Sequence, residues 1–289
     1  MNVHFEPTDI EQVWHAEANI SGPTVAIFGG VHGDELTGIE VVNQSLKGLD
    51  IEAGQVFLAL GNVAAIGQNK RHTGYNLNRA FRELTDEETE RQDDLPYELR
   101  RAQELNSVLR ESDALLDLHD FTDPNGPVFI ITEERGFDVA RAIGAPTISS
   151  GWSVTEPGGS DSYMEAQNRI GICYELGDKT KPVINLERGL GARDRFLEQM
   201  GLRERVSKPM FDNPLYVHTD SSIIRQPGDF RMSRDDFRTF DLLDEGEIIA
   251  VNGDTVHVAE KGQVIIFPPK KIPEIGEEAF SLGRILARR

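Results

Sequence analysis

The chain has 289 residues and a formal net charge of −19, with 38% hydrophobic and 27% charged residues. This composition is typical of a globular protein, either one large domain or a large and a small one. The acidic excess argues against nucleic acids and anionic membranes as partners, because the summed field repels polyanions. No apolar stretch approaches the ~20 residues of a membrane helix and no signal pattern opens the chain, so we expect a cytoplasmic protein.

Strand-like and helix-like segments alternate along the first 200 residues. This alternation predicts an α/β fold with a mixed, mainly parallel sheet flanked by helices. Apolar runs of strand length predict strands at residues 24–28, 55–60, 114–119, 127–132 and 171–176. Apolar residues spaced close to a 3.6-residue period predict helices at residues 35–49, 96–111 and 183–200.

The pattern changes at about residue 209 to short apolar segments separated by turn signals, such as Asn252–Gly253. This spacing predicts a smaller C-terminal all-β domain with hairpins. The prolines of segment 207–214 mark the boundary. We therefore expect a catalytic α/β domain at 1–208 and a small β-rich domain at 209–289.

An acidic run at residues 85–94 carries six acids and one arginine. Such a charge run is typical of a solvated surface loop. The single cysteine, Cys173, lies in the strand-like stretch GICYEL. We interpret it as a packed small hydrophobe rather than a reactive thiol.

The strand at 24–28 leads into FGGVHGDELTG, in which His32 and Glu35 lie three positions apart at the turn into a helix. Two such donors can face one cation such as zinc. The same spacing also fits an ordinary helix start with Asp34 as its cap. The glycines around the histidine imply a tight turn or a close backbone approach, which a plain helix cap does not need.

His119 and Glu175 each end a further strand-like run. Because ligands of open α/β sheets bind beyond the carboxyl ends of the strands, these side chains are expected to converge with His32 and Glu35. A catalytic zinc site has three protein ligands and a fourth position for water. His32, Glu35 and His119 supply such a set, which leaves Glu175 as the base that takes the water proton. We predict one zinc ion per chain.

Asp117 precedes His119 by two residues and so faces the same side of a strand. It either orients a ligand histidine or is an ordinary acid at a strand end. The polar, loop-like segment 61–81 offers Arg71, Asn78 and Arg79 as candidates for anion binding. A guanidinium binds a carboxylate through two parallel hydrogen bonds, although either arginine also suits a surface salt bridge in so acidic a chain.

Four motifs together resemble the succinylglutamate desuccinylase/aspartoacylase family of zinc carboxypeptidase-like hydrolases: GGVHGDE (29–35), RHTGYNLNRAF (71–81), DLHD (117–120) and YELG (174–177). The resemblance covers roughly residues 24–200. The order and spacing of four separate motifs make it specific, and the C-terminal region is similar in pattern to the small β domain of this family.

The resemblance implies three zinc ligands, His32, Glu35 and His119. It also implies that Glu175 activates the attacking water and that Arg71 polarises the scissile carbonyl and stabilises the oxyanion. Asn78 and Arg79 would hold the free α-carboxylate of a small acidic substrate resembling an N-acyl amino acid. A donor aimed at the oxyanion typically contributes ~3 kcal/mol to lowering the barrier of amide hydrolysis.

Aspartoacylase-like members carry a further tyrosine and arginine shortly before the catalytic glutamate, which bind a second carboxylate. Tyr163 matches the tyrosine and is a candidate substrate-binding residue. The position four residues on is Gln167, and Arg169 would require a shift. This departure argues against an N-acyl-aspartate substrate.

The sequence thus favours a zinc-dependent hydrolase that cleaves the amide bond of an N-acyl amino acid or a related small molecule. A carboxypeptidase-like peptidase is the alternative among enzymes, since it needs the same zinc, base and carboxylate clamp. A zinc-containing binding protein that has lost catalysis is disfavoured only because Glu175 and Arg71 are both present. Self-association into a homo-oligomer is compatible with the sequence.

Overall fold

The computed structural model describes residues 3–124, 126–206, 211 and 213–286. The strands of a large sheet are β1 (Glu6–Pro7), β2 (Val13–Glu17), β3 (Thr24–Gly29), β4 (Gln55–Leu60), β5 (Ala114–Phe121), β6 (Phe129–Ile131), β7 (Thr147–Ser150), β8 (Ile170–Asp178), β9 (Leu215–Ile224), β13 (Gln263–Ile266) and β14 (Glu278–Ile285). The strands of a small sheet are β10 (Phe230–Met232), β11 (Ile248–Asn252) and β12 (Thr255–Val258).

The α-helices are α1 (Leu36–Gly48), α2 (Val63–Gln68), α3 (Asp86–Glu90), α4 (Tyr97–Glu111), α5 (Phe137–Ile143), α6 (Trp152–Thr155), α7 (Ser160–Ala166) and α8 (Pro182–Gln199). The 3-10 helices are η1 (Leu77–Arg79), η2 (Gln92–Asp94) and η3 (Glu134–Gly136). Within the described residues, none of the helices has both the length and the apolar character to cross a membrane.

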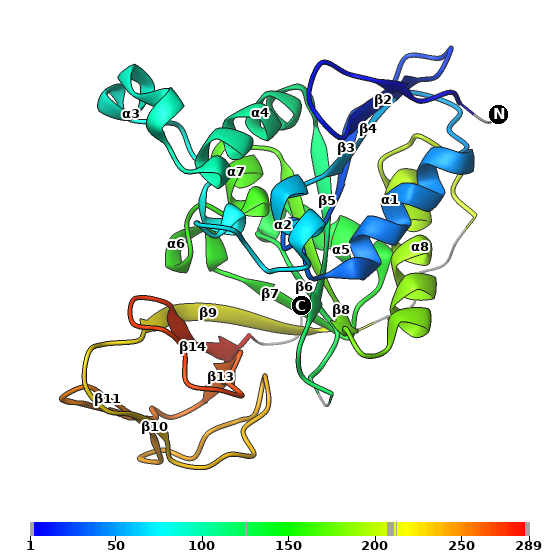
Figure 1. Ribbon diagram of the computed structural model, residues 1–289. Coiled ribbons are helices and arrows are strands. Elements are labelled where there is room, and N and C mark those ends of the chain that lie inside the picture. Colours follow the sequence, from blue (N-terminus) through cyan, green and yellow to red (C-terminus); the bar gives the residue numbers. More distant parts are fainter. Residues whose placement is uncertain (1–2, 125, 207–210, 212, 287–289) are drawn as a thin grey trace.

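The large sheet has 11 strands in the order β1-β2-β4-β3-β5-β8-β6-β7-β9-β14-β13. Its centre, β4-β3-β5-β8, is parallel, whereas β2, β6 and β14 introduce antiparallel pairs. Figure 1 shows α1 and α8 on one side of this sheet and α4 and α7 on the other. The predicted α/β fold with a mixed, mainly parallel sheet flanked by helices is confirmed.

The central strands are buried on both faces, which explains their continuous apolar runs. In β3, Val25 and Ile27 belong to the core cluster that contains residues of α1, α5 and α8. Ala26 and Phe28 belong to the cluster that contains residues of α4 and α7. Successive side chains of one strand therefore support two helical layers, and the carboxyl ends of the strands are fixed between them.

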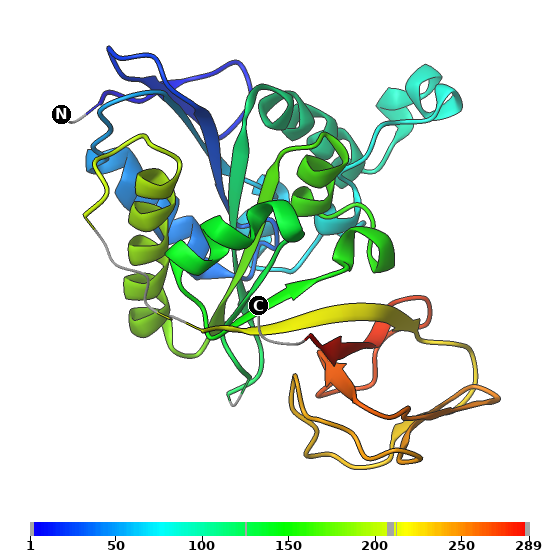
Figure 2. The ribbon, with the colours of Figure 1, turned by 180° about the vertical axis from the view of Figure 1, so that it is seen from behind.

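The C-terminal strands extend the large sheet. β9 pairs in parallel with β7 and antiparallel with β14, and Figure 2 shows β9, in yellow, running from the helical layers toward the small sheet. The predicted hairpin is present as β11 and β12, in which Asn252 pairs with Thr255. The domain boundary at 208/209 stays a prediction, and residues 207–210 and 212 of the expected linker lie outside the described residues.

The acidic run at 85–94 is exposed, but it forms α3 and η2 rather than a loop. Thr85 accepts a hydrogen bond from the Glu88 N–H, and the Glu88 carboxylate accepts one from the Thr85 N–H. This capping box satisfies two main-chain donors that would otherwise lack partners, and it explains why so polar a segment is helical. The segment 61–81 likewise contains α2 and η1.

Candidate metal and catalytic site

The candidate site lies at the carboxyl ends of β3 and β5, where the order of the sheet reverses. After β3 the chain passes through α1 to β4 on one side, whereas β5 lies on the other side of β3. Loops that leave two neighbouring strands in opposite directions open a crevice between them, and α/β sheets bind ligands there. His32 and Glu35 follow β3, and His119 lies on β5.

Two glycines of the turn after β3 are required by its geometry. Gly30 has a φ of 70°, in the left-handed region that side chains with a Cβ rarely adopt. A Cβ on Gly33 would lie 2.3 Å from the carbonyl carbon of Ala65. The turn therefore packs directly against α2, and this close approach sets the position of His32.

The start of α1 differs from an ordinary helix cap. Glu35 is the N-cap residue and its side chain accepts no capping hydrogen bond. Asp34, the cap that the sequence suggested, forms an ion pair of 2.8 Å with Lys179. The N–H of Thr37 instead donates to Asp120 Oδ2 at 2.9 Å, from the end of β5. Because Asp120 caps the helix, the Glu35 carboxylate is available to the site.

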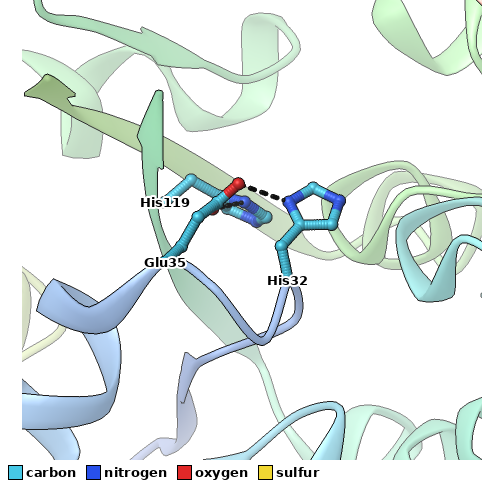
Figure 3. Close-up of side chains that lie close together, drawn as sticks. All are labelled: His32, Glu35 and His119. Carbon is cyan, nitrogen blue, oxygen red and sulfur yellow. Dashed lines mark hydrogen bonds and ion pairs between the residues drawn. The ribbon is translucent and has the colours of Figure 1, made fainter. Parts of the chain in front are cut away.

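Glu35 lies between the two histidines, as Figure 3 shows. His32 Nδ1 is 2.8 Å from Glu35 Oε1, and His119 Nδ1 is 2.9 Å from Glu35 Oε2. One ligand atom from each of the three side chains lies within 4.8 Å of the others, and all three side chains are buried. The structure thus brings together the three residues that the sequence predicted as metal ligands.

The outer ring nitrogens of the two histidines also lie close to oxygen acceptors. His32 Nε2 lies 3.1 Å from Asn76 Oδ1, and the same oxygen accepts the N–H of Asn78 at 3.0 Å. Since that atom accepts a main-chain hydrogen bond, it is the amide oxygen, and it offers an acceptor for a proton on His32 Nε2. On the other side, His119 Nε2 lies 3.1 Å from Asp117 Oδ2, which fits the orienting role considered for Asp117.

The charges of the three side chains fit a cation between them. Burial lowers the pKa of His32 to about 4, so its ring is neutral and can offer a nitrogen lone pair to a cation. Burial opposes ionisation of Glu35, but the two histidines lower its pKa well below the usual value. Burial also opposes protonation of His119, yet Asp117 and the other acidic groups around it raise its pKa well above the usual value, so in the metal-free protein a proton offsets the charge of Glu35.

Two imidazole nitrogens and one carboxylate oxygen are typical zinc ligands. Zn–N and Zn–O distances of about 2 Å separate the ligand atoms of a tetrahedral site by roughly 3.3 Å. Here one ligand atom from each of His32, Glu35 and His119 lies within 4.8 Å of the others, so modest side-chain shifts bring all three to that spacing. The residues present therefore fit one zinc ion.

Glu175 lies beside this group on β8, opposite His119 in the parallel register. Its Oε2 atom is buried and has no hydrogen-bond partner among the described residues. Burial raises the pKa of Glu175 to about 8. A carboxylate with raised proton affinity at the wall of a pocket has the properties of a general base.

One pocket of about 430 Å³ contains the predicted catalytic and anion-binding side chains. Arg71 donates to Glu35 Oε1 at 3.0 Å, and Asn78 and Arg79 line the same pocket. Arg79 is already paired: its guanidinium donates to Glu156, and it lies 3.6 Å from Glu278 of β14. The apolar part of the wall is formed by Phe121, Ile131, Trp152 and Phe267.

The structure does not bring Tyr163 into this pocket. Its hydroxyl donates to Glu83 Oε1 at 2.7 Å and accepts from Arg110 at 2.8 Å, because α7 directs the ring toward α4. The guanidinium of Arg169 donates to the Ser112 carbonyl at 2.7 Å, just beyond the end of α4. Neither side chain is placed to bind a second substrate carboxylate.

Several residues of the site had no sequence prediction. Asn76 could have been found from the N-x-N spacing before η1, since asparagine commonly caps a short helix. Glu278 gave no signal, because the pairing of β9 with β14 joins segments more than 50 residues apart.

Cys173 lines the pocket and is buried, and burial raises the pKa of its thiol, as expected for an unreactive cysteine.

The fold and the site define an α/β protein whose buried His32–Glu35–His119 group could hold a metal ion, with Glu175 and Arg71 lining the same pocket. The model of the succinylglutamate desuccinylase/aspartoacylase catalytic domain matches residues 21–187. The chain belongs to this family.

Two relatives from Rattus norvegicus are similar in sequence. Aspartoacylase is 38% identical over 173 residues, 55% of this chain and 54% of the relative. N-acyl-aromatic-L-amino acid amidohydrolase (carboxylate-forming) is 31% identical over 178 residues, 56% of each chain. The chain therefore spans about half the length of these relatives. The crystal structure of succinylglutamate desuccinylase from Vibrio cholerae shares the fold with a TM-score of 0.77, at 18% identity over 98% of this chain and 91% of that one.

Proposed function

We propose that this protein is a zinc-dependent amidohydrolase that cleaves the amide bond of an N-acyl amino acid or a related small molecule. The observation that carries the proposal is the convergence of the His32–Glu35–His119 group with Glu175 in one pocket. Membership of the family supports it, and so do the names of the two rat relatives, both of which are deacylases.

In the proposed reaction, His32, Glu35 and His119 hold the zinc ion. A zinc ion held there would supply Lewis-acid chemistry, which lowers the pKa of water and polarises a carbonyl. Glu175 takes a proton from the attacking water and returns it to the leaving nitrogen. This role needs a carboxylate whose proton affinity is close to that of the groups it serves, and burial gives Glu175 that property.

Arg71 and Arg79 have separate proposed roles. Arg71 donates to the substrate carbonyl oxygen as negative charge develops on it. Asn78 and Arg79 hold the α-carboxylate of the substrate. Because Arg79 is paired with Glu156 in the free protein, a bound carboxylate must share or replace that partner.

The walls of the pocket favour a small substrate with an apolar part. Phe267, Glu278 and Ala279 line one side, so the segment after residue 209 limits the space available to a peptide chain. Tyr163 and Arg169 lie elsewhere, so neither is available to a second substrate carboxylate. We therefore favour N-acyl derivatives of uncharged amino acids over N-acyl aspartate.

The test is a panel of N-acetylated amino acids and dipeptides with the zinc-loaded protein, followed by measurement of the released amine. We expect release from N-acetyl derivatives of apolar or aromatic amino acids and little release from N-acetyl aspartate. Preferred cleavage of dipeptides would support a peptidase instead. No release from any compound at full zinc occupancy would favour a binding protein.

A further inference from the structure

Glu98 is a fully buried carboxylate on α4 that binds the turn formed by residues 73–75. Its Oε1 accepts the N–H and the hydroxyl of Thr73, both at 2.6 Å, and the N–H of Gly74 at 3.2 Å. Its Oε2 accepts the N–H of Tyr75 at 3.2 Å. Burial opposes ionisation, but these hydrogen bonds lower the pKa of Glu98, so the side chain that holds the turn is a carboxylate.

The turn joins two residues that contact the metal-binding group. Arg71 precedes it and donates to Glu35 Oε1 at 3.0 Å. Asn76 follows it, and its Oδ1 lies 3.1 Å from His32 Nε2. The segment is also tied to the turn after β3, since the Gly33 N–H donates to the Arg71 carbonyl at 3.2 Å. Glu98 therefore fixes the backbone between the two contacts without touching either ligand.

We propose that Glu98 is a positioning residue of the metal site, and that it acts on His32 through Asn76 and on Glu35 through Arg71. With the turn held, Asn76 keeps the His32 proton on Nε2 and leaves Nδ1 for a cation. This inference rests on the proposed zinc site. A role confined to stability is the competing explanation, since three main-chain donors lose their acceptor if Glu98 is replaced.

Glu133 provides a matched control for this distinction. Its carboxylate accepts the N–H groups of Gly151 and Ser153 at 3.1 Å and the Ser153 hydroxyl at 2.8 Å. It thus holds a turn with the same kind of contacts, but this turn does not contact the metal-binding group. Replacing either acid by glutamine removes acceptor capacity and brings an N–H₂ group against main-chain donors.

The experiment measures the zinc dissociation constant of folded wild type, Glu98→Gln and Glu133→Gln by competition with a chromophoric chelator. We expect Glu98→Gln to weaken zinc binding by about 10- to 100-fold, the range typical for residues that orient metal ligands. The zinc dissociation constant of Glu133→Gln should remain within about 2-fold of wild type, even if its melting temperature falls as much as that of Glu98→Gln. Equal zinc affinity of Glu98→Gln and wild type would overturn the proposal.

A second pair of variants keeps the test decisive if Glu98→Gln does not fold. Thr73→Val removes only the hydroxyl hydrogen bond to Glu98 and should weaken zinc binding by several-fold. Asn76→Ala removes the acceptor for His32. If Glu98 acts through Asn76, Thr73→Val will have little further effect in the Asn76→Ala background. Full additivity of the two changes would contradict the proposed route.

The metal-free protein supplies a readout that does not depend on zinc. The ¹⁵N chemical shifts of His32 should report the Nε2–H tautomer in wild type and a mixture of tautomers in the Glu98 variant. If wild type binds no zinc, the proposed function fails, but the tautomer comparison still decides the role of Glu98. An unchanged His32 tautomer in the variant would contradict it.

Discussion

His119 on β5 and Glu175 on β8 are direct neighbours across two parallel strands. Residues opposite each other in such a pair present their side chains to the same face of the sheet. A proposed metal ligand and the proposed base are therefore placed by strand register rather than by a mobile loop. This arrangement predicts that chemistry at Glu175 can be removed without disturbing metal binding.

Glu175→Gln should lower kcat by roughly 10²- to 10⁴-fold, because the amide cannot take the proton of the attacking water. The variant should keep one zinc per chain, since Glu175 is not among the three proposed ligands. Steady-state kinetics and metal analysis of the same preparation test this prediction. Normal turnover by the variant would rule out the assigned role.

Arg71→Ala should lower kcat by roughly 10²- to 10³-fold, which corresponds to the loss of one oxyanion donor. KM should change much less, because the proposed contact strengthens only as charge develops on the carbonyl oxygen. Arg71→Lys should restore part of the rate, since it returns a positive charge but not the planar donor. A large rise in KM at unchanged kcat would instead assign Arg71 to substrate binding.

Tyr163→Phe should leave KM within about 2-fold of wild type and lower the free energy of unfolding by about 1 kcal/mol. The reason is that the Tyr163 hydroxyl contacts Glu83 and Arg110 and does not line the pocket. Kinetics and urea denaturation separate the two effects. A large increase in KM with unchanged stability would restore the substrate-binding role suggested by the sequence.

Glu278→Gln should make the protein less sensitive to alkaline pH. Burial, and then the neighbouring Glu156, raise the pKa of Glu278 well above its ordinary value of 4.5. The stability that protonation of Glu278 contributes is fully present below the pKa that this group has in the unfolded chain. It is lost as pH rises through the pKa that the group has in the folded protein. Between these two pKa values, the free energy of unfolding of wild type should fall by up to about 1.4 kcal/mol per pH unit relative to that of the variant.

Urea denaturation of wild type and Glu278→Gln between pH 5 and pH 9 measures this difference. As pH rises, the free energy of unfolding of wild type should fall relative to that of the variant. A gap that does not change with pH would show that Glu278 has an ordinary pKa in the folded protein.

The central strands and the proposed metal ligands were predictable because their signals are local. The runs that became β3, β4, β5 and β8 are apolar on both faces, and each candidate ligand lies at or just beyond the carboxyl end of its strand. The short strand β7, of sequence TISS, has no such run. Its position depends on pairing with β6 and β9, which sequence periodicity does not encode.

The contacts that complete the site are non-local, which explains why they were missed. Glu98 binds a turn 23 to 25 residues before it, and nothing in the surrounding helix pattern distinguishes it from a surface glutamate. Glu278 reaches Arg79 only because β14 pairs with β9 and continues the large sheet. Tyr163 was matched from its position in a motif, but the direction in which α7 points its ring decides its contacts.

We expect one zinc ion at His32, Glu35 and His119 to support amide hydrolysis. The most direct measurement is titration of zinc into the metal-free protein, with zinc binding and hydrolysis of the best N-acetyl amino acid followed together. We predict that activity rises linearly and saturates at one zinc per chain. Hydrolysis that persists in the metal-free protein, or zinc binding that saturates without hydrolysis, would contradict this role of the zinc ion.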